Sequence, residues 1–142
     1  MERIILAYSG GLDTSVAIPW LRDAYRAEVI AVTVDLGQGP DLEAVRDRAL
    51  AAGAVRAHVL DLREDLARDF MLPALRADAI CEDRCPLGTA LGRPLIAHAL
   101  MKIAGIERAT IVAHGGAVRG HDRARLDVAL QALDPTLRVL AP

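Results

Sequence analysis

The chain has 142 residues, 53% of them apolar and 25% charged, and its formal net charge is −2. This length and composition predict one folded domain over residues 1–142 and exclude a disordered chain. The near-neutral charge and the lack of a long apolar run exclude a general affinity for nucleic acid and a membrane-spanning segment.

Apolar periodicity predicts strands alternating with helices along the whole chain. Strands are expected over 3–8, 28–36, 57–62, 109–115 and 137–142. Helices are expected over 14–25, with Asp13 or Thr14 as N-cap, and over 41–52, 94–104 and 121–133. A further helix over 63–79 is expected to break near Pro73, and the proline- and glycine-rich residues 81–94 are expected to form a loop or a broken segment.

This alternation predicts the α/β class, with a doubly wound, five-stranded parallel sheet. Such sheets bind ligands where the carboxyl ends of the strands meet, at the point where the strand order reverses. The loops expected to carry a site are therefore 8–14, 35–41 and 113–122. In the second of these, Asp35 suits a contact with a ribose or with a water on Mg²⁺, or else begins a turn.

The first of these loops reads Ser9-Gly10-Gly11-Leu12-Asp13-Thr14-Ser15 and directly follows a buried strand. Two glycines allow a ligand to approach the backbone, and the next helix presents free N–H groups that favour a phosphate. A tight turn before a capped helix is the alternative. The Walker and Rossmann glycine patterns are absent, and the chain's only lysine is Lys102.

This heptad resembles the S-G-G-x-D-[ST]-S pyrophosphate loop of the N-type ATP pyrophosphatases, which cleave ATP to AMP and pyrophosphate while adenylating a substrate. With the segments 28–39, 87–97 and 113–127, the whole chain resembles the nucleotide-binding part of argininosuccinate synthases. The resemblance implies an adenine-nucleotide hydrolase-like (HUP, Rossmann-like) fold and ATP with Mg²⁺ as cofactors. The nucleotide-binding residues that it implies are Ala7, Tyr8, Ser9, Gly10, Gly11, Asp13, Thr14, Ser15, Ala31 and Gly115.

The resemblance is weakest where the family holds its two amino-acid substrates. Cys85 and Ala90 stand where the family has a tyrosine and a serine for citrulline. Ala117 and His121 stand where it has a threonine and an asparagine for aspartate, whereas Asp122 and Arg125 match the family and Arg119 replaces its lysine. Each lost partner costs roughly 1–3 kcal/mol of binding, so a different small-molecule acceptor is expected.

Cys81 and Cys85 replace both family tyrosines of this segment and suggest a second interpretation. Related pyrophosphate-loop enzymes displace AMP with sulfur carried on a cysteine, and nearby Arg84 and Arg93 would favour a thiolate. Inert packing cysteines are the alternative. A C-x₃-C pair with no second pair gives no reason to expect a metal site.

Three functions are therefore open: a ligase-like adenylating domain, an ATP-dependent sulfurtransferase, and a non-catalytic nucleotide-binding remnant. The catalytic candidates are Asp13, Asp122, Arg125, Cys85 and Cys81. His114 is a further candidate for contact with a ligand, with a structural role as the alternative. The apolar last strand and the family's larger second part predict a homo-oligomer or a complementing chain. With two cysteines and no visible signal peptide, we expect a cytoplasmic protein.

Overall fold

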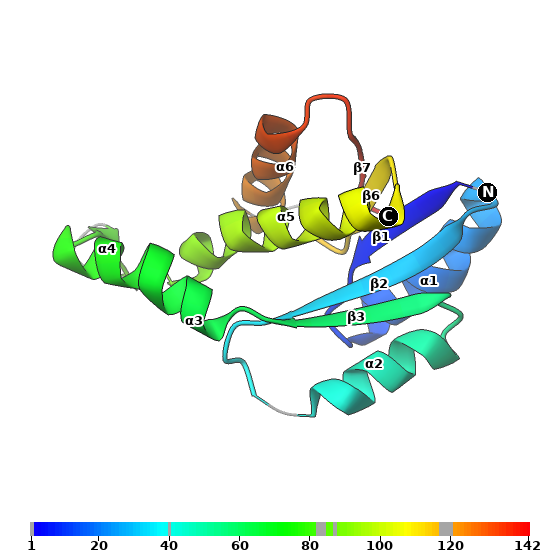
Figure 1. Ribbon diagram of the computed structural model, residues 1–142, viewed down its shortest axis with the longest axis horizontal. Coiled ribbons are helices and arrows are strands. Elements are labelled where there is room, and N and C mark those ends of the chain that lie inside the picture. The colour runs from blue at the N-terminus through cyan, green and yellow to red at the C-terminus, as the bar shows by residue number, and fades with distance from the viewer. Residues whose placement is uncertain (1, 40, 82–84, 87, 117–120) are drawn as a thin grey trace.

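The computed structural model describes residues 2–39, 41–81, 85–86, 88–116 and 121–142. Its centre is a five-stranded, wholly parallel sheet in the order β3-β2-β1-β6-β7 (Figure 1). The strands are β1 (Arg3–Ala7), β2 (Glu28–Asp35), β3 (Arg56–Asp61), β6 (Ile111–His114) and β7 (Arg138–Leu140). The chain reverses its direction across the sheet between β1 and β6, which confirms the predicted doubly wound topology.

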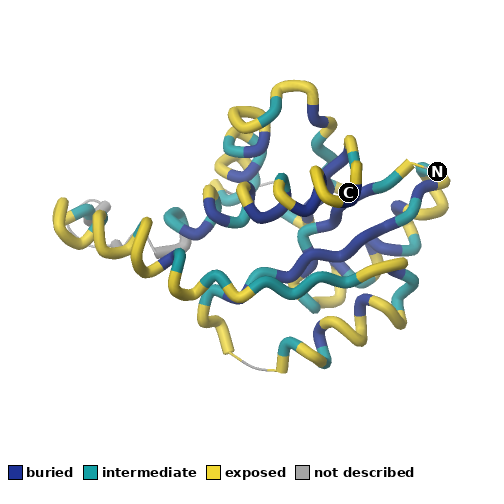
Figure 2. The backbone as a smooth tube through the Cα atoms, viewed as in Figure 1, coloured by how far each residue is buried: buried dark blue, intermediate teal, exposed yellow. Residues whose placement is uncertain are grey.

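Helices cover both faces of the sheet because successive strand residues point to opposite sides. On one face, Ile4 and Leu6 of β1 pack with α1 (Leu12–Tyr25) and α2 (Leu42–Ala51). On the other face, Ile5 packs with α5 (Gly88–Glu107) and α6 (His121–Leu133). β1 and most of β2 are buried along their length (Figure 2), as β-branched strands covered on both faces should be.

The structure corrects two local predictions near the helix ends. The N-cap of α1 is Gly11, one residue before the helix, and Asp13 and Thr14 lie inside its first turn. The predicted break near Pro73 is a π-helical segment, η1 (Leu66–Met71), between α3 (Arg63–Asp65) and α4 (Leu72–Arg76). Pro73 is the second residue of α4, in its first turn, where its missing N–H is tolerated.

The described part of the segment 81–94 is a broken segment of strand and helix rather than a loop. Two short antiparallel strands, β4 (Ile80–Cys81) and β5 (Cys85–Pro86), precede α5, which already begins at Gly88 and passes through Pro94. β4 and β5 lie with α3, η1 and α4 at the end of the molecule toward which the sheet strands run (Figure 1). Across the described ranges, no helix combines the length and apolarity needed to cross a membrane.

Candidate nucleotide site

The glycine-rich loop lies where β1 ends, and its backbone explains its composition. Gly10 has a φ of +79°, which side-chain-bearing residues rarely adopt, and a Cβ there would lie 3.0 Å from Val45 of α2. Gly11 is different, because its φ of −79° and ψ of 173° are ordinary extended values. A Cβ on Gly11 would meet only the Ser9 hydroxyl, at 3.4 Å. The local backbone conformation and the contact with α2 therefore require glycine at position 10. At Gly11 the missing side chain instead leaves an open space at the start of α1.

The hydroxyl groups of the loop brace it from inside. The Thr14 and Ser15 hydroxyls both donate to the Gly11 carbonyl, at 3.3 and 2.8 Å. Ser9 Oγ lies 3.1 Å from Thr14 Oγ1, and the Tyr8 hydroxyl lies 2.8 Å from Ser15 Oγ. These bonds hold the carbonyl of Gly11 toward the helix, so the first turn of α1 is fixed before any ligand arrives.

No side chain caps α1, because its N-cap residue is glycine. The first N–H groups of a helix lack partners inside it, and the helix dipole adds partial positive charge at the same place. The loop therefore offers backbone donors to an anion at the carboxyl edge of the sheet, which is the arrangement that phosphate groups favour. Asp13 is exposed in the same turn.

Three of the predicted nucleotide-binding residues, Ala7, Tyr8 and Ala31, differ in burial. Ala7 ends β1 and is partly buried, and Tyr8 is 3% exposed, with its N–H donating to the Val32 carbonyl. Ala31 is 1% exposed and lies in the core beneath α1 and α2. Its side chain lies in the core because Ala31 is four residues before the end of β2. A contact of Ala31 with the nucleotide stays a prediction.

The backbone that follows β6 lies against the glycine-rich loop that follows β1, because the two strands are neighbours in the sheet. His114 and Ala7 are register partners, and a Cβ on Gly115 would lie 3.0 Å from Thr14 Cγ2. The backbone at Gly115 thus packs directly on the glycine-rich loop. His114 is 1% exposed and bonded through both ring nitrogens, so the predicted direct contact with a ligand does not fit it.

The acceptor-side candidates Asp122 and Arg125 meet at the start of α6. Asp122 accepts a hydrogen bond from Arg93 of α5 at 2.8 Å and lies 3.6 Å from Arg125. The hydrogen bond from Arg93 is the main cause that lowers the pKa of Asp122, followed by the charges of Arg93 and Arg125. Asp122 is thus held as an anion and is unsuited to be a proton donor. Arg93 Nε is buried and has no hydrogen-bond partner among the described residues.

The remaining acceptor-side predictions are only partly described. His121 is exposed in the first turn of α6, and Ala90 is half-buried in α5. The backbones of Cys81 and Cys85 are paired directly across β4 and β5. Ala117, Arg119 and Arg84 lie outside the described residues. Sequence reasoning missed Arg93 as the partner of Asp122, because nothing in the spacing relates residues 29 apart on two helices.

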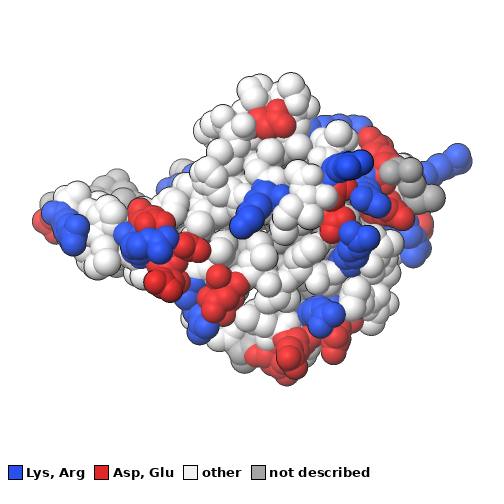
Figure 3. Space-filling model, in the orientation of Figure 1, with Lys and Arg blue, Asp and Glu red and all other residues white. Residues whose placement is uncertain are grey.

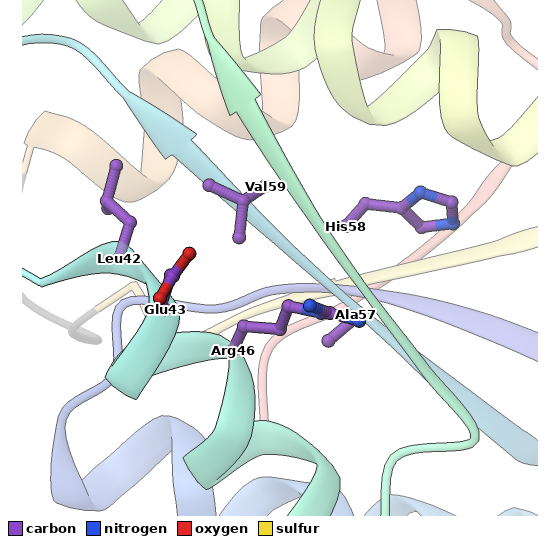
Figure 4. Close-up of a pocket in the computed structure, with 6 residues that line it drawn as sticks. All are labelled: Leu42, Glu43, Arg46, Ala57, His58 and Val59. Carbon is purple, nitrogen blue, oxygen red and sulfur yellow. The ribbon is translucent and has the colours of Figure 1, made fainter.

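Two surface hollows lie near residues 35–41, the second of the predicted ligand-binding loops. Neither hollow is lined by any of residues 7–15. One, of about 380 Å³, lies between Leu42, Glu43 and Arg46 of α2 and the edge strand β3. Figure 4 shows Ala57 and Val59 directed toward α2, whereas His58 points to the other side of the strand. Another, of about 340 Å³, is lined by Asp61, Arg63, Glu64 and Asp65.

The buried carboxylate of Asp35 belongs to a turn. Asp35 is 7% exposed, accepts a hydrogen bond from the Gly37 N–H at 2.8 Å and lies 3.4 Å from Arg63 Nε. These partners favour the turn-initiating alternative over a ribose contact. No group of three or more metal-binding side chains occurs among the described residues. Asp13, exposed in the first turn of α1, is the carboxylate of the loop that fits a Mg²⁺ ion carried by phosphate oxygens.

The sequence matches a known family over nearly its whole length. Residues 3–142 match the family model described as arginosuccinate synthase N-terminal HUP domain. The chain is 48% identical over 141 residues to an argininosuccinate synthase of Caldanaerobacter subterraneus subsp. tengcongensis, and 53% identical over 141 residues to one of Streptococcus thermophilus. These alignments cover 99% of the chain but only 34% and 35% of the relatives, so the chain spans about a third of their length.

Solved structures share the fold at low sequence identity. A 4-thiouridine synthetase, solved with RNA and bound ATP, aligns with a TM-score of 0.63 at 20% identity, covering 99% of this chain and 36% of that one. A predicted tRNA methyltransferase subunit of Methanocaldococcus jannaschii gives 0.65 at 14% identity, covering 100% and 68%. The NH3-dependent NAD synthetase of Campylobacter jejuni gives 0.54 at 13%, covering 78% and 45%.

Proposed function

Since the chain belongs to the argininosuccinate synthase family, as its N-terminal HUP domain, we propose that it binds ATP with Mg²⁺ at residues 9–15 and supports adenylation of a small-molecule acceptor. The observation that carries this proposal is the uncapped start of α1 at Gly11, where β1 ends. Backbone donors fixed there by the hydroxyls of Thr14 and Ser15 suit the β- and γ-phosphates.

In the proposed reaction, an acceptor oxygen attacks the α-phosphorus of ATP. The bond from that phosphorus to the bridging oxygen breaks, and the electron pair leaves with pyrophosphate. The loop's part is to hold pyrophosphate as its charge grows, through N–H groups that need not reorganise. Asp13 would help to hold Mg²⁺ in the loop, where the ion would supply further positive charge for the leaving pyrophosphate.

The acceptor is proposed to bind beside α6, where Arg93 and Arg125 flank Asp122. Two arginines suit a carboxylate or the α-phosphate, because each guanidinium donates in a fixed plane. The substitutions at Cys85, Ala90, Ala117 and His121 support an acceptor site that differs from the family's citrulline and aspartate sites.

The rest of the site is proposed to come from another chain segment. The relatives are about three times as long as this sequence, and their additional length leaves room for a covering part, fused or separate. A homo-oligomer and a cytoplasmic location remain part of the proposal.

The test is a reaction of this chain with ATP, Mg²⁺, citrulline and aspartate, followed by pyrophosphate release and mass spectrometry. We expect ATP binding by calorimetry but no argininosuccinate, because four substrate positions are changed. Formation of argininosuccinate at about 1 s⁻¹ or faster, an ordinary enzymatic rate, would contradict the altered acceptor site. Pyrophosphate release only with added sulfide would instead favour the sulfurtransferase, and absence of ATP binding would contradict the whole proposal.

A further inference from the structure

One buried titratable side chain beside the proposed nucleotide site has no part in the proposed reaction. His114 ends β6 and is 1% exposed, next to β1 and the loop that follows it. Its Nε2 lies 2.6 Å from Oδ1 of Asp127, a residue of α6. Its Nδ1 accepts a hydrogen bond from the Gly116 N–H at 3.2 Å.

These two hydrogen bonds assign the tautomer of the ring. Since Gly116 donates to Nδ1, that nitrogen accepts with its lone pair. Nε2 then carries the hydrogen that the Asp127 carboxylate accepts. In this Nε2–H form the imidazole links α6 to the backbone that follows β6.

Arg123 completes the arrangement from one helical turn away. Its Nε lies 3.6 Å from the other carboxylate oxygen of Asp127, and the two side chains are each about one-third exposed. The Asp127 carboxylate is therefore held from two sides, by Arg123 at Oδ2 and by His114 at Oδ1.

The backbone held in this way touches the proposed phosphate loop. Gly115, between His114 and Gly116, packs so closely on Thr14 that an added Cβ would lie 3.0 Å from its methyl group. Thr14 is 6% exposed and bonds to Ser9 and to the Gly11 carbonyl. A shift of the backbone after β6 would therefore reach the residues that set the first turn of α1.

We infer that His114, held between Asp127 and the Gly116 N–H by its two ring nitrogens, is a positioning residue that keeps the backbone at Gly115 and Gly116 against Thr14 and so keeps the nucleotide loop in its binding form. This inference rests on the proposed ATP site. In this inference His114 does not contact the nucleotide, and Asp127 acts only through its hydrogen bond with the imidazole.

The test compares ATP affinity and stability in variants of Asp127. Asp127→Leu removes the acceptor for Nε2–H and is expected to weaken ATP binding about tenfold, which corresponds to loss of one moderate hydrogen bond. Asp127→Asn keeps an oxygen acceptor and is expected to stay within about threefold of the wild type. Gln131→Leu introduces the same side chain at an exposed position of α6 and serves as the matched control.

Calorimetry measures the ATP affinity, thermal unfolding without ATP measures the stability, and nitrogen NMR of the imidazole reports the tautomer. We expect the Nε2–H form of His114 in the wild type and in Asp127→Asn, and its loss in Asp127→Leu. If Asp127→Leu does not fold, Asp127→Ser, whose side chain is too short to reach Nε2, replaces it.

The outcomes separate this inference from the proposed function. Wild-type ATP affinity in Asp127→Leu, or an Nδ1–H tautomer in the wild type, overturns the positioning role and leaves the ATP site intact. An equal loss of affinity in Gln131→Leu also overturns it, because the effect would then be one of general helix damage. Absence of ATP binding in the wild type overturns the proposed function and this inference together.

Discussion

Gly11→Asp is expected to abolish ATP binding while leaving the folded chain at least as stable as the wild type. Gly11 is the N-cap of α1 and has an extended backbone that any residue adopts. A carboxylate at an N-cap accepts hydrogen bonds from the first-turn N–H groups and favours the helix dipole. It would occupy the donors that the phosphates are proposed to use and add a negative charge there. We expect affinity to fall by about 100-fold or more.

Gly10→Val is expected to affect stability more directly than ATP binding. Gly10 needs a φ of +79°, and its side chain would meet Val45 at 3.0 Å rather than the space in front of α1. The substitution is expected to lower the unfolding temperature first and to weaken ATP binding as a consequence. Two adjacent glycines thus have separable roles, one in the fold and one in binding.

Calorimetry with ATP and Mg²⁺, together with thermal unfolding of each variant without nucleotide, distinguishes these effects. Gly11→Ser, which caps the helix without a charge, is the matched control and is expected to bind ATP more weakly than the wild type but better than Gly11→Asp. Near-wild-type ATP affinity in a folded Gly11→Asp variant would rule out phosphate binding at the start of α1.

The sheet was predictable because its strands are buried on both faces. β2 is a continuous run of apolar, mostly β-branched residues, and such runs have few alternatives to a central parallel strand. The position of the glycine-rich loop was predictable for a related reason. Glycine and hydroxyl residues directly after a buried strand are typical of a ligand-binding loop at the edge of a sheet. Ser9 and Thr14 are indeed brought together there.

Long-range partners were not predictable from the pattern of the chain. Pro94 suggested the end of a loop, yet α5 continues through it, because helix packing on the sheet outweighs one missing hydrogen bond. Ala31 was placed near the nucleotide by resemblance alone, and register with Leu6 puts it in the core. The pairs Arg93–Asp122 and His114–Asp127 join residues on different elements, and spacing carries no signal for them.

Glu107 is the other residue whose replacement should have a large effect, here on stability. This carboxylate ends α5 and is 2% exposed, at the amino ends of the strands and far along the sheet from the proposed site. It accepts hydrogen bonds from Arg56 at 2.6 Å and pairs with His58 at 2.9 Å, and Arg3 donates to its backbone carbonyl at 2.9 Å. Charged side chains of both signs gather at the end of the molecule where the strands begin (Figure 3).

Glu107→Gln keeps the shape of the side chain but removes the negative charge that faces Arg56 and Arg3. Hydrogen bonds to charged groups contribute about 1.5–3 kcal/mol, so the free energy of unfolding near pH 7 should fall by about that amount. The unfolding temperature should drop on the order of 5 °C. Glu64→Gln, the same change at an exposed residue of α3, is the control and should alter stability by less than about 0.5 kcal/mol.

The difference between wild type and Glu107→Gln should also depend on pH in a definite direction. The hydrogen bond from Arg56 is the main cause that lowers the pKa of Glu107, and the bond with His58 adds to it. A group whose pKa is lower in the folded state stabilises that state above its unfolded pKa and loses this contribution as pH falls through its folded pKa. The stability difference should therefore be fully present at pH 6–7, shrink below about pH 4.3, and vanish once folded Glu107 is protonated. Denaturant unfolding from pH 7 to pH 3 measures it, and a difference that grew toward low pH would show that the carboxylate is not stabilised as an anion in this cluster.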